Sequence, residues 1–117
     1  MTAAVAEADA LWAAVGDPTR RRLLDALLAL GEATATTLSG RLPVTRQAVA
    51  KHLTVLERVG LVDGRKEGRQ VLYAIRPERL DEAGQAMARA AAAWDQRLAA
   101  IKDLAEAAHR EAQAKKK

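Results

Sequence analysis

One stretch in the middle of the chain carries hydrogen-bond donors and cations at helical spacing. Residues 45–59 follow the period of an α-helix, and at about 100° per residue one side of it presents Gln47, Lys51, Thr54 and Arg58. The opposite side presents Val49, Leu53 and Leu56. We therefore expect one side of this helix to pack against a core and the other to offer an amide, an ammonium and a guanidinium to a polar partner.

A basic hairpin is predicted directly after this helix. Gly60 is a typical helix-ending residue, Leu61 and Val62 begin a strand, and the return strand shows the alternation Val71, Tyr73, Ile75. Glu67 and Gly68 supply turn residues, and the cations near the tip are Arg65, Lys66 and Arg69. A helix followed by a cationic hairpin is typical of a winged helix, which inserts the helix into a groove of DNA.

The positive charge of the chain is concentrated on this helix and hairpin. Residues 41–79 hold nine Lys or Arg against four Asp or Glu, whereas residues 1–40 carry a net charge of −2 and residues 80–117 a net charge of +1. An ordinary solvated basic surface would explain the excess but not its position beside an exposed helix face. The charge pattern therefore favours a polyanion, and double-stranded DNA above all, as the partner.

Size and composition favour one small, mainly helical domain. Ala supplies the largest share of the 50% hydrophobic content of the 117 residues, and aromatic residues make up only 3%. The chain has no Cys, so disulfides and thiolate metal sites are excluded. The N-terminal segment has acids where a signal peptide carries cations, and no apolar run has the length of a membrane span. We therefore expect a cytoplasmic protein without membrane contacts.

Three helices are expected before residue 45. The first covers residues 3–15, where the apolar positions at helical spacing are Val5, Ala8, Trp12 and Val15. The second begins at Pro18 with Asp17 as its N-cap, and its predicted buried stripe is Leu23, Leu24, Leu27 and Leu28. The third covers residues 35–42, and the short link to the Thr45-capped helix completes a helix-turn-helix.

Three arginines stand in the first turn of the second helix. Arg20, Arg21 and Arg22 occupy positions where the helix dipole disfavours cations. This arrangement indicates either a phosphate nearby or plain solvation of the three side chains.

A long helix with a two-helix seam is expected from Pro77 onward. Steps of four and three residues connect Leu80, Gly84, Met87, Ala91, Trp94, Leu98, Ile101, Ala105 and Ala108. We predict a homodimer through the first and last helices, with packing onto its own domain as the alternative. The predicted interface residues are Trp12, Met87, Ala91, Trp94, Leu98 and Ile101. The predicted organisation is a single domain over residues 1–110 and a disordered basic tail over residues 111–117.

The order of these motifs resembles the ArsR type of winged helix-turn-helix transcriptional regulators. GDPTRRRLLDAL is similar to their second helix, LPVTRQAVAKHLTVLERVGLV to their helix-turn-helix, GRKEGRQVLYAI to their wing, and AAAWDQRLAAIKDL to a terminal dimerisation helix. The resemblance covers nearly the whole chain. It implies a mainly α fold with a small β-hairpin, in which four helices, two strands and a fifth helix follow one another.

The resemblance makes residues 35–42 the supporting helix and residues 45–59 the recognition helix of a sequence-specific, dimeric repressor that binds an inverted-repeat operator. Gln47 and Lys51 are the candidates for base edges, because an amide pairs with adenine and an ammonium with guanine in the major groove. Arg46 is a candidate for contacts with either bases or phosphates. The candidates for backbone and minor-groove contacts are Ser39, Thr45, Arg65, Lys66 and Arg69.

The metal sites of the resembled family are not matched by this chain. TTLSGRL lacks the cysteine pair that many relatives use, and Arg97 stands where a His ligand would be needed. His109 and Glu111 have no matching second pair of ligands, so we expect neither a metal nor a cofactor. Trp12 and Trp94 either frame a pocket for an apolar small-molecule effector or simply pack.

Two other classes of function compete with a DNA-binding regulator. An enzyme needs a convergent set of catalytic groups, and this chain offers only scattered carboxylates and two distant His, so no enzymatic activity is expected. A winged-helix module for protein interaction or antirepression, without specific DNA binding, is the second. It is favoured if Glu57, Asp63 and Glu67 neutralise the basic face.

Overall fold

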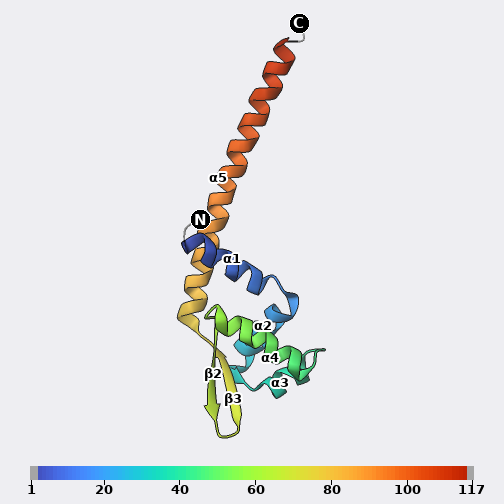
Figure 1. Cartoon of the computed structure of the whole chain (residues 1–117), viewed down its shortest axis with the longest axis vertical. Coiled ribbons are helices and arrows are strands. Elements are labelled where there is room, and N and C mark those ends of the chain that lie inside the picture. Colours follow the sequence, from blue (N-terminus) through green and yellow to red (C-terminus); the bar gives the residue numbers. More distant parts are fainter. Residues whose placement is uncertain (1–2, 116–117) are drawn as a thin grey trace. The chain divides into compact units, whose positions relative to one another are not determined.

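The computed structural model describes residues 3–115, with side chains described from residue 6 onward, and has the predicted winged helix-turn-helix fold (Figure 1). The elements in order are α1 (Ala3–Val15), α2 (Pro18–Leu30), β1 (Glu32–Ala33), α3 (Ala35–Arg41), α4 (Arg46–Arg58), β2 (Val62–Glu67), β3 (Gln70–Ile75) and α5 (Pro77–Lys115). Within the described residues, no helix is long and apolar enough to cross a membrane.

Side-chain caps define where three of these helices begin. The Asp17 carboxylate accepts hydrogen bonds from the backbone N–H groups of Thr19 and Arg20, at 2.8 and 3.1 Å. The bond from Arg20 is the main reason that the pKa of Asp17 lies below its ordinary value, although desolvation opposes the shift. The hydroxyl oxygens of Thr34 and Thr45 cap α3 and α4 in the same way.

The core is almost entirely aliphatic and centres on the helix-turn-helix. Val49, Leu53 and Leu56 of α4 are each 0% exposed, which confirms the predicted inner side of this helix. They join a cluster with further fully buried residues from α1 to β2: Leu11, Leu23, Leu27, Leu38, Leu61 and Val62. Fully burying side chains of this size is worth roughly 1.5–3 kcal/mol each relative to exposure, so the rotation of α4 is firmly set.

The strands form a three-stranded antiparallel sheet in the order β1-β3-β2. The hairpin of β2 and β3 is the predicted wing, and its register pairs Glu67 with Gln70. The turn is therefore Gly68-Arg69, with φ of 63° at Gly68, rather than the predicted Glu67-Gly68. A glycine first in a two-residue turn matches the twist of the strands.

Strand β1 was not predicted from the sequence. Its two residues, Glu32 and Ala33, pair with Ala74 and Tyr73 of β3. Two residues cannot show a strand period, and their pairing depends on β3, which lies about forty positions further along the chain. Strand β3 of this sheet also contacts α2 and α3.

One predicted buried position was wrong. Leu28 is 61% exposed, so the buried stripe of α2 consists of Leu23, Leu24 and Leu27 alone. On α1 the buried positions are Ala8, Leu11 and Ala14, and Trp12, a predicted interface residue, is 47% exposed in the single chain. The side chain of Val5 lies outside the described residues. Trp12 and Leu28 each lie beside the buried face of their helix, because only a narrow stripe of each helix packs against the core.

The chain divides into a compact unit that ends at Met87 and a second unit that begins at Ala88. The first unit includes the start of α5, where Ala83 is buried and Leu80 and Met87 pack against the core. The second unit is helical to Lys115, so the prediction of disorder from residue 111 was wrong for residues 111–115; residues 116–117 lie outside the described part. Ala is the best helix former, and the sequence around residues 105–114 is rich in it.

The link between α4 and β2 requires a glycine for two reasons, which gives a testable prediction. Gly60 has φ of 81°, and a Cβ there would lie 2.9 Å from Nε of Arg79. Gly31 has nearly the same φ, 82°, but no atom within 4 Å of such a Cβ. We expect Gly31→Ala to lower the free energy of unfolding by about 1 kcal/mol and Gly60→Ala by roughly twice as much.

Urea unfolding measures both losses, and Gly31→Ala is the matched control for the backbone strain. The difference between the two variants should disappear in an Arg79→Ala background, because the crowding atom is then gone. Equal losses in the native background would contradict the close approach.

Candidate nucleic-acid interface

The exposed side of α4 presents the polar residues that the sequence placed there. Gln47, Lys51, Thr54 and Arg58 are all exposed, and Arg46 lies beside them in the first turn. Among residues 3–115, no ion pair involves Arg46 or Lys51. Because the opposite side of α4 is locked into the core, these donors are held outward on a rigid element.

The three cations of the wing differ in their surroundings. The guanidinium of Arg65 forms ion pairs with Glu32, at 3.0 Å, and with Glu67, at 3.2 Å. Lys66 and Arg69 are exposed, and no ion pair within the described residues involves either of them. At the base of the wing, Arg76 pairs with Asp63 at 3.3 Å. The net positive charge of the wing is therefore concentrated at Lys66 and Arg69.

The start of α4 and the tip of the wing meet at one hollow. It has a volume of about 220 Å³, and two guanidinium-bearing residues, Arg46 of α4 and Arg69 of the hairpin turn, line it. Thr34 and Thr36 at the start of α3 and Gln70 of β3 add polar groups. The structure thus brings together two residues that the sequence predicted separately, and no acidic residue is in the lining.

Tyr73 also lines this hollow, and the sequence analysis gave it no functional role. Burial raises the pKa of its phenol, and the negative charge of Glu57 raises it further, so the hydroxyl stays protonated and able to donate. Its ring packs beside Gly64, where a Cβ would lie 3.1 Å from Cε1. The alternation of Val71, Tyr73 and Ile75 predicted the strand, but only the fold shows which element faces Tyr73.

The hydroxyl groups near the interface are not equally free to donate. Ser39 donates to the carbonyl of Thr36 at 2.9 Å, and Thr54 donates to the carbonyl of Ala50 at 3.0 Å. Thr45 instead accepts from the backbone N–H of Ala48 at 3.1 Å, which leaves its proton for another partner. Among the predicted phosphate contacts, Thr45 therefore has a donor available in this conformation and Ser39 does not.

Arg20 has a structural role in place of the phosphate contact that its position suggested. Its Nε donates to the carbonyl of Ala14 at 2.6 Å, and Nη2 donates to the carbonyl of Ala13 at 3.0 Å. These bonds satisfy carbonyls at the end of α1 that have no partner within the helix. Nη1 lies 3.2 Å from Nδ1 of His52, which places the half-buried His52 at the edge of α4 rather than toward a DNA groove.

The predicted interface residues of the second unit are exposed in the single chain. Trp94, Leu98 and Ile101 are 58%, 57% and 60% exposed, and the guanidinium of Arg97 lies 5.3 Å from the centre of the Trp94 ring. Such a row of large apolar side chains favours contact with another molecule. Within residues 3–115, no group of three or more His, Asp or Glu could hold a metal ion.

Comparison with known proteins decides the family. A model described as a helix-turn-helix domain matches residues 15–65. The HTH-type transcriptional regulator YuzN of Bacillus subtilis is 46% identical over 67 residues, which cover 52% of this chain and 73% of the relative. The HTH-type transcriptional regulator CmtR of Mycobacterium tuberculosis is 44% identical over 70 residues, which cover 60% of this chain and 58% of the relative.

A solved structure of an ArsR-like transcriptional regulator from Rhodococcus sp. RHA1 is similar to this chain. The similarity covers 88% of this chain and 96% of the Rhodococcus chain, with 40% sequence identity and a TM-score of 0.69. The chain belongs to the ArsR family. This family consists of winged helix-turn-helix transcriptional regulators, and the prediction of a DNA-binding transcription regulator is thereby confirmed. In this ArsR-family protein, the exposed side of α4 and the wing carry the outward-facing cations described above.

The different surroundings of Arg69 and Arg76 predict different effects on DNA binding. Arg69→Ala should weaken binding to all duplexes alike and reduce the slope of log K against log salt by about 1, because one phosphate contact is lost. Arg76→Ala removes the same charge from a residue that is paired with Asp63, and should leave the slope nearly unchanged.

Fluorescence anisotropy with a labelled duplex at several salt concentrations measures both slopes. Arg76→Ala is the matched control for the change in net charge. If both variants lost the same slope, only net charge would matter and the assignment of Arg69 would be wrong.

Proposed function

We propose that this regulator acts as a homodimeric repressor that binds an inverted-repeat operator. In each half-site α4 enters the major groove and the wing lies on the adjacent backbone; the two grooves are about 34–36 Å apart. The observation that carries the proposal is the pair of exposed side chains Gln47 and Lys51 on a helix whose opposite side is fully buried, with Lys51 in no ion pair among the described residues. Repression follows where the operator overlaps a promoter.

Base reading in this proposal falls to Gln47 and Lys51. Both side chains extend from the first two turns of α4, which is the part of a recognition helix that reaches base edges. An amide donates and accepts toward adenine, and an ammonium donates to the acceptors of guanine. Each such contact is worth roughly 1–3 kcal/mol of discrimination.

Phosphate binding in this proposal centres on the hollow between α3, α4 and the wing. Arg46 and Arg69 supply guanidinium donors there, and Tyr73 supplies a protonated hydroxyl. Thr45 and Lys66 extend the contact on either side, whereas Ser39 would first have to give up its bond to Thr36. Arg65 contributes less, because two carboxylates already neutralise it.

The distribution of acids favours DNA over a protein partner for this surface. Asp63 and Glu67 pair with Arg76 and Arg65, and neither forms an ion pair with the exposed side of α4 in the described residues. The protein-interaction alternative required these acids to cancel the basic face. The third of these acids, Glu57, raises the pKa of Tyr73, and no ion pair in the described residues involves it.

Dimerisation in this proposal uses the predicted row on α5 together with Trp12 of α1. Trp94, Leu98 and Ile101 are exposed, as an interface seen in one chain requires. Ala91 adds a small residue that permits close approach, and Met87 already packs in part against its own core. An apolar small-molecule effector stays a separate prediction, which quenching of Trp fluorescence by candidate ligands would test.

The experiment that tests the proposed function is a footprint and a binding titration on the region upstream of the protein's own gene. We expect one protected inverted repeat and a large excess of affinity over a scrambled duplex. No shift of either duplex at low salt would overturn the proposal and favour a module that binds protein.

The same duplexes separate base reading from phosphate binding. Gln47→Ala and Lys51→Ala should each weaken operator binding by roughly 1–3 kcal/mol and hardly change binding to the scrambled duplex. This follows because a base contact discriminates between sequences and a phosphate contact does not. Equal losses on both duplexes would remove that residue from the base-reading set.

The dimer seam can be tested with two substitutions on one helix. Ile101→Asp places a charge in the proposed seam and should weaken the dimer at least tenfold, because a carboxylate would be buried without a partner. Leu104→Asp makes a similar change at a residue that is 72% exposed and lies off the seam, and should leave the dimer nearly unchanged. Sedimentation velocity reports both; a dimer that survives Ile101→Asp contradicts the seam.

A further inference from the structure

A second hollow lies within the first unit where α1, the end of α4 and the start of α5 meet. It has a volume of about 310 Å³ and is lined by Glu7, Ala10, Leu11, Arg58, Val59 and Arg79. This volume is at the lower end of the range of small-molecule pockets, which is about 300–1,000 Å³. Arg58 also belongs to the exposed side of α4, and the other five residues lie outside the proposed DNA-contacting set.

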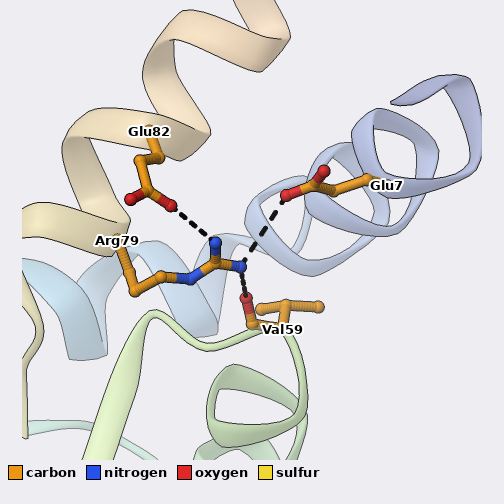
Figure 2. Close-up of polar contacts among 4 residues, drawn as sticks. All are labelled: Glu7, Val59, Arg79 and Glu82. Atoms are coloured by element: carbon orange, nitrogen blue, oxygen red, sulfur yellow. Dashed lines mark hydrogen bonds and ion pairs between the residues drawn. The ribbon is translucent and has the colours of Figure 1, made fainter. Parts of the chain in front are cut away.

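Arg79 holds this region together through bonds of very different length. Figure 2 shows its guanidinium extending from the first turn of α5 toward the carbonyl of Val59 and the carboxylate of Glu7. The distance from Nη1 to the carboxylate of Glu82 is 2.7 Å, but Nη2 lies 3.4 Å from the carbonyl of Val59 and 3.7 Å from the carboxylate of Glu7. Glu82 therefore binds Arg79 tightly, and Glu7 only weakly.

The charge that remains for an anion in this lining is that of Arg58. Arg58 and Arg79 contribute two guanidiniums and Glu7 one carboxylate, but Glu82, outside the lining, already pairs with Arg79, whereas no ion pair in the described residues involves Arg58. A guanidinium binds a carboxylate through two parallel hydrogen bonds, a geometry that the long contact with Glu7 does not achieve. A better-placed carboxylate would therefore displace that of Glu7.

The rest of the lining is apolar. Leu11 is 2% exposed and joins the core, and Ala10 and Val59 complete an aliphatic wall. An anion with an apolar body fits this combination, whereas inorganic phosphate would leave the wall without a partner. We propose that this hollow binds a small organic monocarboxylate, whose carboxylate takes the place of Glu7 on Arg79 and whose apolar body lies against Leu11 and Val59.

A ligand bound in this hollow would contact residues that connect α4, the proposed recognition helix, to α1 and α5. Val59 is the C-cap of α4, Glu7 belongs to α1, and Arg79 connects both to α5. A carboxylate that displaces Glu7 removes the ion pair between α1 and α5. This ligand-binding proposal does not depend on the proposed operator, because binding of the carboxylate can be measured without DNA.

Isothermal titration calorimetry on the full chain tests the proposal with hexanoate and benzoate, and with hexanamide and benzamide as uncharged controls of the same shape. At least one of the two carboxylates should bind saturably at one site per chain, and its amide at least tenfold more weakly. No saturable binding of either acid at millimolar concentration would overturn the proposal. Equal binding of acid and amide would do the same, because the guanidiniums would then have no role.

Variants locate the bound carboxylate. Glu7→Gln should tighten binding severalfold, because it removes the competing anion, and Arg58→Gln should weaken it at least tenfold. Arg79→Gln should also abolish binding, but Arg58 is exposed and its variant keeps the test valid if loss of Arg79 disturbs folding. Arg76→Gln is the control for net charge and should bind as the native chain does. Unchanged affinity in both Glu7→Gln and Arg58→Gln would contradict the site.

Discussion

The burial of Val49, Leu53 and Leu56 fixes the rotation of α4 about its own axis, and the function of this protein depends on that rotation. Rotating the helix by one residue, about 100°, would expose part of this apolar side and turn Lys51 toward the core. Both changes would lower the stability of the fold by several kcal/mol, because apolar side chains would be exposed to water and the ammonium of Lys51 would lose its hydration. The same packing that stabilises the domain therefore decides which groups of α4 face outward, where the proposed DNA contacts lie.

The wing follows from how the chain leaves α4. Gly60 adopts a positive φ, Leu61 and Val62 return to the core, and the hairpin then extends away from it with only its first residue buried. Along the hairpin, Asp63 near the base pairs with Arg76 and Glu67 beside the turn pairs with Arg65, so that Lys66 and Arg69 carry the charge outside these ion pairs. Charge placement and backbone geometry together join the wing to the start of α4 at one basic hollow.

The sequence predicted those features that depend on local period and on capping chemistry. The two sides of α4, the caps at Asp17 and Thr45, and the hairpin are of this kind. It did not predict strand β1, because two residues carry no period and need β3 as a partner. It left Arg20 between a phosphate contact and plain solvation and did not predict its structural role, since the carbonyls that Arg20 binds belong to another helix. Pairings between distant elements, such as Tyr73 with the hollow, require the fold.

The most direct test of the DNA-binding surface is a titration of the ¹⁵N-labelled protein with a duplex from the region upstream of its own gene, followed by amide chemical shifts. We expect the largest changes at residues 46–51 on α4 and at Gly68 and Arg69 in the wing turn. Amides of the buried core and of residues 105–114 should change little. Changes confined to α5, or no changes at low salt, would contradict the assignment of α4 and the wing as the DNA-binding elements.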